Sequence, residues 1–437
     1  MGPVYFLMSP FDELLAHAHE ALRTVEGVTT AVRGGITLRS HFQPIYSLSH
    51  GRVVGHEALM RATGQDGQSL SPPDVFALCS TRHELAAFDR LSRLVHVHNM
   101  DVDRQRDHWL FLNVHSTVLS DSLRGDFAEM LAAYCAYGRI RPEQVVLEIL
   151  EGAIHSDDRL DEAVSHIKRA GFLVAIDDFG AGHSNFERVW RLNPDIVKLD
   201  RTLTSRSTQS ARNQRMVAQM VSLLHECGAL VLLEGVETAD EALLAFDCDV
   251  DLVQGYYFGR PAPQPVPHGY APDVLKRLYA DFQVFHRDKS KAYRESVAPY
   301  LNGLGYAATL LSAGRTMTEA CQSFLELPHA DMCYLLNAEG RQFGEVVLSP
   351  QASGVSAPAY APLRDADGAS WSRRKYFRDA LASPGRVHIS QPYRATQGHR
   401  MCVTVSSCFN TQVNGRTQTQ VICGDFLTDD DLTHVGY

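Results

Sequence analysis

Hydrophobic residues in the first two thirds of the chain follow two alternating patterns. Short apolar runs of strand length are followed by longer stretches in which apolar residues recur every three or four positions. A continuous apolar run predicts a buried strand, and the longer spacing predicts an amphipathic helix. The predicted strands cover residues 53–59, 109–114, 145–149, 172–176, 196–199, 230–233 and 250–258, with an eighth near residues 41–46. The predicted helices cover residues 74–98, 126–137, 158–170, 209–227 and 240–246.

Strands that alternate with helices predict parallel strands joined by helical crossovers. Eight such strands are typical of a closed (β/α)8 barrel. An open, doubly wound α/β sheet is the rival architecture, and it is disfavoured because no Gly-x-Gly-x-x-Gly sequence follows the first predicted strand. We therefore expect an α/β fold with a TIM-like (β/α)8 barrel over residues 41–266, preceded by a helical lead-in over residues 1–40.

A cluster of prolines marks the end of the predicted barrel. The four residues are Pro261, Pro263, Pro265 and Pro267, and so many prolines are incompatible with a helix or a central strand. A long helical pattern follows over residues 271–298, with Pro272 in its first turn and Pro299 as its expected stop. We assign residues 267–309 to a connector helix.

The remainder of the chain, residues 310–437, has a different pattern. A predicted helix at 317–325 is followed by short strand-like runs separated by turn sequences. These runs cover residues 332–336, 346–348, 387–390, 402–408 and 420–426. The pattern predicts an α+β domain with an antiparallel sheet.

Composition narrows the class of protein. The 437 residues are 45% hydrophobic and 21% charged, which are ordinary globular values. A formal net charge of −10 argues against DNA or RNA as a partner, because such binding depends on Lys and Arg contacts to phosphates. Without a membrane-spanning run or a cleavable signal, we expect a cytoplasmic protein. Nine scattered cysteines without a C-x-x-C pair argue against disulfides and structural zinc.

Each predicted barrel strand from residue 53 onward delivers an ionisable or amide side chain at its carboxyl end. These residues are Glu57, Asn113, Glu148, the pair Asp177 and Asp178, Lys198, Glu234 and Gln254. In a parallel barrel the carboxyl ends of the strands share one face, where barrel enzymes have their active sites. So many carboxylates on one face need cations to offset their repulsion. The all-oxygen donor set predicts Mg²⁺ or Mn²⁺, and adjacent Asp177 and Asp178 can serve two ions.

Two divalent cations side by side are typical of phosphoester hydrolysis. In such a site Lys198 is the electrostatic partner of the water or phosphate, and Glu234 is a base or a further ligand. His56 directly precedes Glu57, so on a strand it should point to the opposite face.

The same residues lie in motifs that resemble EAL domains, which are bacterial cyclic di-GMP phosphodiesterases with a TIM-barrel-like fold. The resemblance covers about residues 40–265 and rests on eight motifs in order. They begin at Gln43, Glu57 (Glu-Ala-Leu-Met-Arg), Leu112, Leu147, Ile176, Val197, Glu234 and Gln254. The resemblance implies metal-dependent hydrolysis of cyclic di-GMP to linear pGpG.

The resemblance also implies a role for each matching residue. Glu57, Asn113, Glu148 and Asp177 would hold a first metal, Asp178 a second, and Lys198 and Glu234 would activate water together with Glu57. Gln43, Arg61, Gln254 and Asp200 would contact the dinucleotide, while Glu151 and Glu237 would support the loop and the metal region.

One loop departs from the family pattern, in which the two aspartates are usually followed by Phe-Gly-Thr-Gly-Tyr-Ser. Here Ala181 stands in place of the threonine, and His183 in place of the tyrosine. In this family the loop is associated with metal binding coupled to a homodimer, which we expect here. The alternative is therefore a catalytically degenerate EAL domain that acts as a cyclic di-GMP receptor.

The C-terminal segment, about residues 310–430, resembles a PAS-like domain of the Cache kind, as found after some cytoplasmic EAL domains. This resemblance implies a regulatory domain that holds an unidentified small ligand. The residues it assigns to the ligand are Arg374, Tyr376, Tyr393 and Asp425. The alternative is a dimerisation module whose pocket is not used.

Overall fold

The fold is taken from a computed structural model. It describes residues 20–100, 107–115, 118–119, 126–150, 158–182, 186–351, 366–395, 401–413 and 415–428. The chain divides into two compact units, the first made of Met1–Gln209 and Asn213–Gln283, and the second of Ser210–Arg212 and Val284–Tyr437.

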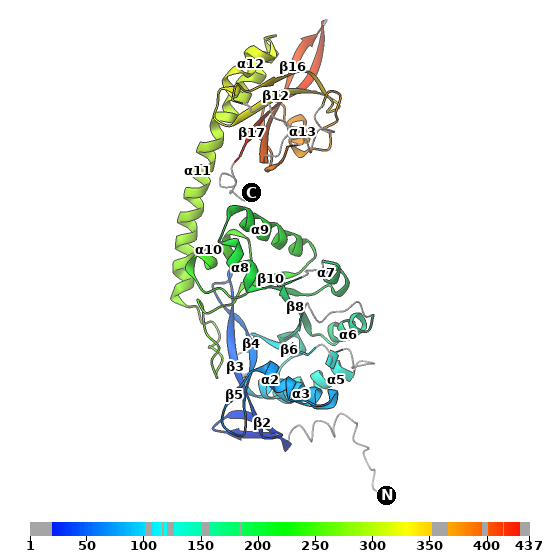
Figure 1. The fold of residues 1–437 in the computed structure, drawn as a ribbon, viewed down its shortest axis with the longest axis vertical. Coiled ribbons are helices and arrows are strands. Elements are labelled where there is room, and N and C mark those ends of the chain that lie inside the picture. Colours follow the sequence, from blue (N-terminus) through cyan, green and yellow to red (C-terminus); the bar gives the residue numbers. More distant parts are fainter. Residues whose placement is uncertain are drawn as a thin grey trace. The chain divides into compact units, whose positions relative to one another are not determined.

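The first unit contains a closed barrel of eight strands (Figure 1). Around the barrel the strands follow the order β3, β11, β10, β9, β8, β7, β6 and β4, and β4 pairs with β3 to close the ring. Their bounds are β3 (Ile36–Ser47), β4 (Arg52–Thr63), β6 (Trp109–Val114), β7 (Val145–Leu150), β8 (Leu173–Phe179), β9 (Ile196–Leu199), β10 (Leu230–Leu233) and β11 (Leu252–Val253). The predicted TIM-like barrel is therefore confirmed.

One strand departs from the all-parallel arrangement that strand–helix alternation predicts. The other seven run parallel, but β3 is antiparallel to both of its neighbours, β4 and β11. The cause is the short turn between β3 and β4, which has no room for a crossover helix and ends at Gly51 with a φ of 62°. A direct hairpin joins antiparallel strands only.

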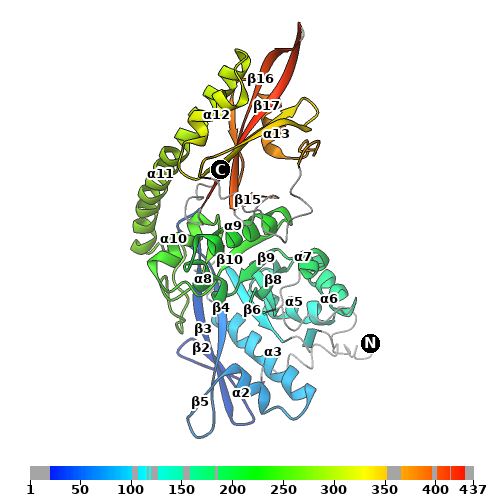
Figure 2. The same ribbon diagram turned by 45° about the horizontal axis from the view of Figure 1, so that its top comes forward.

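Helices cover the outside of the barrel (Figures 1 and 2). They are α2 (Pro72–Ala77), α3 (Arg82–Asn99), α5 (Asp126–Gly138), α6 (Asp158–Arg169), α7 (Phe186–Leu192), α8 (Arg201–Ser207), α9 (Ala211–Glu226) and α10 (Ala239–Asp247), with the short helix η1 (Pro142–Gln144). The single helix predicted over residues 74–98 is in fact two. Thr81 separates them, because its side chain accepts a hydrogen bond from the backbone of Glu84 and caps α3.

The helical lead-in predicted over residues 1–40 is wrong in its described part. Residues 22–40 form β1 (Leu22–Val25), β2 (Val28–Arg33) and the start of β3, all antiparallel, and β5 (Ser69–Leu70) pairs with β4 at the same edge. This stretch is rich in Val and Thr, which favour strands. Gly27, with a φ of 79°, makes the tight turn between β1 and β2.

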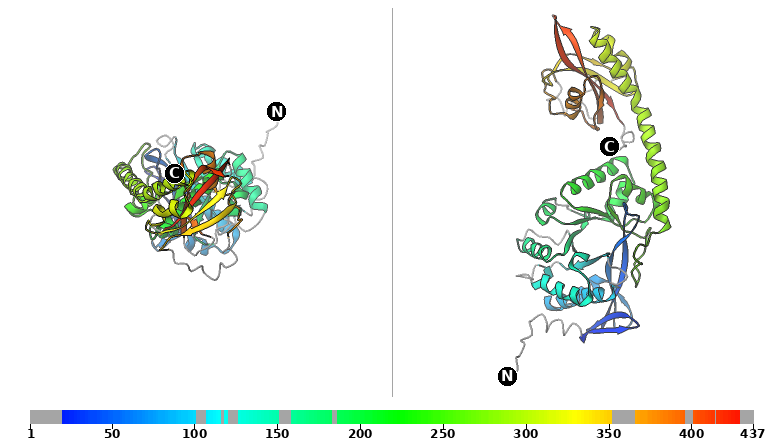
Figure 3. Two further views of the ribbon diagram at one scale, coloured as in Figure 1. Left: turned by 90° about the horizontal axis from the view of Figure 1, so that it is seen from above. Right: turned by 180° about the vertical axis from the view of Figure 1, so that it is seen from behind.

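Helix α11 (Asp273–Ser312) extends well beyond the helical pattern of residues 271–298 (Figure 3, right). It begins near Pro272, as expected, but it continues through Pro299. Pro299 lies on the exposed side of the helix, whereas Leu304 and Ala307 beyond it are fully buried in the core of the second unit. Packing of this last part offsets the hydrogen bond that the proline removes.

The second unit is built on an antiparallel sheet in the order β13, β12, β17, β16, β14, with β15 paired to β16. This confirms the predicted antiparallel domain, and the long β16–β17 hairpin is prominent in Figure 2. The strands are β12 (Ala330–Asn337), β13 (Gln342–Leu348), β14 (Val387–Ile389), β15 (Tyr393–Arg394), β16 (Met401–Val413) and β17 (Arg416–Leu427). The end of α11 and α12 (Met317–Leu325) pack on one face, and α13 (Lys375–Ala382) packs on the other.

His96 of α3 makes the stability of the first unit dependent on pH. Its ring is buried, with Nδ1 2.8 Å from Ser40 Oγ and Nε2 3.0 Å from Ser92 Oγ. Burial, together with nearby arginines, lowers the pKa of His96 to about 3. Between that value and the ordinary pKa near 6.5, the unfolded chain binds a proton that the folded protein excludes.

We therefore expect the free energy of unfolding to fall as the pH drops from 6.5 towards 4. His96→Asn should remove about 1 kcal/mol per pH unit from that slope. Urea unfolding measured at several pH values tests this, with His83→Asn, an exposed position of the same helix, as the control. Equal slopes for the unaltered protein and His96→Asn would contradict the prediction.

Candidate functional site

A layer of polar side chains lies directly on an apolar layer inside the barrel. The apolar layer consists of Ile45, Phe111, Val146, Ala175, Ile196, Leu232 and Leu252, all buried. The polar residues lie two positions further along the parallel strands, and they are Asn113, Glu148, Asp177, Lys198, Glu234 and Gln254. Glu57 of β4 and Gln43 of β3, which pair with each other, complete the polar layer. Side chains two residues apart share a face of a strand, so the apolar layer fixes where the polar layer points.

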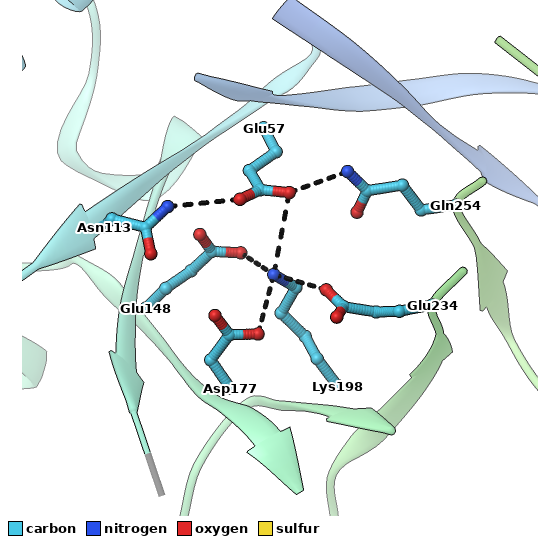
Figure 4. Close-up of polar contacts among 7 residues, drawn as sticks. All are labelled: Glu57, Asn113, Glu148, Asp177, Lys198, Glu234 and Gln254. Atoms are coloured by element: carbon cyan, nitrogen blue, oxygen red, sulfur yellow. Dashed lines mark hydrogen bonds and ion pairs between the residues drawn. The ribbon is translucent and has the colours of Figure 1, made fainter. Parts of the chain in front are cut away.

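The Lys198 ammonium occupies the centre of this layer (Figure 4). Its Nζ lies 2.5 Å from Glu148 Oε1, 2.6 Å from Glu234 Oε1, 2.9 Å from Asp177 Oδ1 and 3.8 Å from Glu57 Oε2. The lysine side chain is only 1% exposed. Four carboxylates that come from four separate strands or strand ends are therefore held around one buried positive charge.

Two amides hold Glu57 in place. Asn113 Nδ2 donates to Glu57 Oε1 over 3.1 Å, and Gln254 Nε2 donates to Glu57 Oε2 over 2.7 Å (Figure 4). Gln254 directly follows β11. The strand predicted over residues 250–258 is therefore limited to Leu252 and Val253. Gly255, the next residue, passes so close to Val236 that a Cβ on it would lie 2.1 Å from the carbonyl oxygen of Val236, so only glycine fits there.

Asp177 and Asp178 point towards the same site although they are neighbours in the sequence. Side chains normally alternate between the faces of a strand. Here Asp178 adopts a left-handed conformation, with a φ of 56°, and the pairing of β8 with β9 shifts register between Ile176 and Phe179. As a result, oxygens of Asp177, Asp178 and Glu234 lie within 4.8 Å of one another, a spacing suited to a metal ion.

Burial and the neighbouring charges shift the pKa values of the side chains in the polar layer. Burial raises the pKa of Glu148 well above its usual value, although Lys198 opposes the shift. Burial likewise raises the pKa of Glu234 to about 8, and burial with the charge of Asp177 raises that of Asp178 to about 6. Burial alone would lower the pKa of Lys198, but the surrounding carboxylates raise it well above its usual value. The lysine is therefore a fixed positive charge.

The residues present fit divalent cations. Five carboxylates face one ammonium, so negative charge is in excess, and every other donor is an amide or carboxylate oxygen. Within the described part of the chain, Glu148 Oε2 and Gln254 Oε1 are buried without a hydrogen-bond partner. Oxygen donors of this kind are the ligands that Mg²⁺, Mn²⁺ and Ca²⁺ prefer.

The remaining barrel residues singled out by the sequence lie near the rim. Arg61 lies on the same face of β4 as Glu57, four residues further along the strand. Asp200 caps α8 by accepting from the backbone of Thr202 at 2.8 Å, and it adds to the negative charge felt by Asp178. Glu237 is exposed and pairs with Arg201 over 3.5 Å. Glu151 and His183 lie outside the described residues.

His56 faces away from this layer, as its place next to Glu57 predicts. It is fully buried on the outer side of the barrel, where Nε2 accepts from the backbone of Val266 over 3.1 Å. It is therefore not part of the polar layer.

Sequence reasoning missed a buried ion pair that supports the site. Arg93 of α3 pairs with Asp89 over 2.5 Å, and both side chains are almost completely buried. Asp89 also accepts from the backbone of His115 at 3.2 Å, so the pair holds the end of β6 just beyond Asn113. The sequence shows the i,i+4 spacing of Asp89 and Arg93, but such charge pairs normally lie on an exposed face of a helix.

The four residues predicted for a C-terminal ligand lie close together in the second unit. The rings of Tyr376 and Tyr393 stack at 6.4 Å, and the Arg374 guanidinium lies 4.8 Å from the centre of the Tyr393 ring. Asp425 is buried beside them and lines the same cavity as Tyr393.

The sequence of the chain is similar to a family model and to several known proteins. Residues 27–261 match a family model described as the EAL domain. YkuI of Bacillus subtilis, named as an uncharacterized EAL-domain containing protein, is 24% identical over 349 residues, which is 78% of this chain and 83% of YkuI. The cyclic di-GMP phosphodiesterase RocR of Pseudomonas aeruginosa is 26% identical over 231 residues, which is 52% of this chain and 57% of RocR.

The fold comparison extends over most of the chain. The crystal structure of YkuI, described as a complex with substrate c-di-GMP and calcium, superposes with a TM-score of 0.72 and 21% identity over 89% of this chain and 94% of YkuI. The barrel, the long helix and the antiparallel-sheet domain therefore share one fold with YkuI. The chain spans only 33% and 29% of two other relatives, an uncharacterized protein of Azorhizobium caulinodans and the probable cyclic di-GMP phosphodiesterase PdeA of Escherichia coli.

None of the helices in the described ranges has the length and apolar character needed to cross a membrane.

Removing the central ammonium should destabilise the protein in the absence of metal. Lys198→Met leaves buried carboxylates without their partner, which typically costs about 3–5 kcal/mol. Urea unfolding in the presence of a chelator measures this loss, and added Mn²⁺ should recover part of it. Lys168→Met is the matched control, because Lys168 pairs with Asp195 over 3.0 Å but remains 28% exposed, so its loss should cost about 1 kcal/mol or less. Equal losses in the two variants would contradict the central role of Lys198.

Proposed function

Because this chain belongs to the EAL domain family, we propose that it is a metal-dependent phosphodiesterase that hydrolyses cyclic di-GMP to linear pGpG. The family model covers the whole barrel, from residue 27 to residue 261. RocR is a cyclic di-GMP phosphodiesterase, and the YkuI structure is a complex with substrate c-di-GMP. We extend this substrate to the present chain as part of the proposal.

The observation that carries the proposal is the complete polar layer around Lys198. Every barrel strand contributes a polar side chain to it, and the excess of carboxylates matches the demand for divalent cations. Glu57, Asn113, Glu148 and Asp177 would hold one cation, and Asp178 would take part in holding a second. When bound, such cations polarise a phosphodiester and lower the pKa of a water molecule.

The chain's own residues account for the remaining requirements of hydrolysis. In the absence of metal, burial raises the pKa of Glu234 to about 8. Its carboxylate would accept the proton of an attacking water. Lys198 keeps its proton because the carboxylates around it raise its pKa. Its fixed positive charge, 2.6 Å from Glu234, would stabilise negative charge that develops on the phosphate.

Polar residues beyond Lys198 would orient the nucleotide. Gln43 pairs in register with Glu57 and donates to the carbonyl of Gly259 over 3.3 Å, so its amide is fixed at the mouth of the barrel. Arg61 offers a guanidinium on the same face, suited to phosphate or guanine. Gln254 lies beside the reacting centre through its hydrogen bond to Glu57.

We further propose that the second unit regulates this activity.

Hydrolysis is the direct test. We expect the purified protein with Mg²⁺ or Mn²⁺ to convert cyclic di-GMP to pGpG, as measured by chromatography. Glu57→Gln and Glu234→Gln should each lower the rate at least about 100-fold, because each removes a charge that the chemistry requires. Glu162→Gln, at an exposed position of α6, serves as the control. Full rates in both site variants would refute the mechanism.

A cyclic di-GMP receptor without catalysis is the second candidate, and the altered loop favours it. Calorimetry would then show nucleotide binding while chromatography shows no pGpG at any metal concentration. In that case the double variant Ala181→Thr and His183→Tyr should restore turnover, because it rebuilds the usual family loop. If the double variant binds nucleotide but still fails to hydrolyse it, the loop is not the cause.

A further inference from the structure

The side-chain amide of Asn113 has two tasks in the polar layer. Its Nδ2 donates to Glu57 Oε1 over 3.1 Å, because a carboxylate can only accept (Figure 4). Its Oδ1 is therefore the atom left for a cation. Both atoms point correctly only if the backbone at the end of β6 is held in place.

The end of β6 is also the point at which its pairing with β4 stops. The last pair of residues in that ladder is Ala58 and Leu112, one residue before Asn113. A neighbouring parallel strand would donate to the backbone carbonyl of one residue and accept from the amide two residues later. The backbone carbonyl of Asn113 and the amide of His115 form such a pair of groups.

Two side chains of α3 meet these groups in place of a strand. Asp89 Oδ1 accepts from the backbone amide of His115 over 3.2 Å, and Arg93 Nη1 lies 3.5 Å from the backbone carbonyl oxygen of Asn113. The carboxylate and the guanidinium pair with each other and are almost completely buried. The guanidinium also lies 5.1 Å from the centre of the Phe127 ring of α5, so both helices hold it in place.

Stability alone does not account for a charge pair at this depth. Replacing a buried ion pair by apolar residues of similar volume is often neutral or stabilising, because buried charges lose their hydration. Neighbouring positions of α3 are buried and apolar, among them Leu91, Leu94 and Val95. What apolar side chains cannot supply is a donor and an acceptor for the backbone at the end of β6.

We propose that Asp89 and Arg93 are positioning residues for the binding of a divalent cation by Asn113. They fix the backbone on both sides of Val114, so that the Asn113 amide can hold Glu57 and a cation together. This inference rests on the proposed function, because it takes the polar layer to be a metal site. Groups that orient a ligand without touching the metal typically change metal affinity by about 10–100-fold when they are removed.

Binding of Mn²⁺ to the full-length protein, without nucleotide, tests the proposal. The double variant Asp89→Leu with Arg93→Met removes both charges together, so it leaves no buried charge unpaired. It should weaken binding by about tenfold or more, as measured from the electron paramagnetic resonance signal of free Mn²⁺. Unchanged affinity in this variant would overturn the proposal.

Leu91→Ala is the matched control for a loss of stability in α3. Leu91 is buried in the same helix, but it packs in the apolar cluster with residues of β2, β3 and β4. Its truncation should lower the melting temperature and leave the affinity for Mn²⁺ unchanged. A loss of affinity equal to that of the double variant would mean that the pair acts only through stability, and the proposal would be wrong.

The same titration in an Asn113→Ala background shows whether the pair acts through Asn113. The carboxylates of the site remain in that background, so it should still bind Mn²⁺, although more weakly. Adding the double variant should then cause no further loss, because the side chain that the pair positions is absent. The same fold loss in both backgrounds contradicts the proposal.

A second variant covers the case in which the double variant does not fold. Arg93→Lys keeps the positive charge beside Asp89, but its side chain is one atom shorter, so it should lose the contact with the Asn113 carbonyl and weaken Mn²⁺ binding several-fold. Unchanged affinity in Arg93→Lys then overturns the proposal. Hydrolysis is measured separately. If Mn²⁺ binding responds as expected in a protein that makes no pGpG, only the proposed function fails.

Discussion

The buried ammonium of Lys198 is the interaction on which the functional end of the barrel depends. It is the common partner of carboxylates from β4, β7, β8 and the end of β10, which would otherwise repel one another in a low-dielectric interior. At an effective dielectric constant of about 20, each close pair attracts by roughly 4 kcal/mol, while the loss of hydration opposes every buried charge. One ammonium cannot balance five carboxylates. Burial is the main cause of the raised pKa values of Glu148 and Glu234, and the neighbouring carboxylates raise them further. The excess of carboxylates also creates the demand for bound cations.

The position of that ammonium is set by the stagger of the barrel strands. Asn113 pairs in register with Glu148, but Glu148 pairs with Ala175, so Asp177 lies one side-chain step higher on the next strand. Lys198 in turn pairs with Leu232, which places Glu234 a further step along β10. Such stagger accompanies the tilt of strands in a closed barrel. Side chains that are not neighbours in the hydrogen-bonded ladder can therefore meet at one point in space.

This geometry explains how far the sequence alone can lead. Apolar runs that end in charged residues predict a barrel with a polar face, because burial and strand periodicity act locally. The left-handed conformation of Asp178 is not readable in this way, since it depends on a register shift against β9. The reversal of β3 and the strands of residues 22–40 escaped the alternation rule, because their hairpin turns replace helical crossovers. Asp89 and Arg93 stayed hidden because an i,i+4 charge pair normally lies on an exposed helix face.

The excess of acidic residues has a different meaning once these sites are located. A net charge of −10 disfavours binding along a nucleic acid, yet part of that charge is concentrated where buried carboxylates face each other or stand alone. In the barrel the carboxylates converge from many strands, so only small cations of high charge can satisfy them. In the second unit a single buried carboxylate, Asp425, accepts from Thr404 over 2.7 Å, and the positive charge of Arg374 acts on it. The demand for added cations therefore comes from the convergence of several buried carboxylates on one point, and a single buried carboxylate with its own partners makes no such demand.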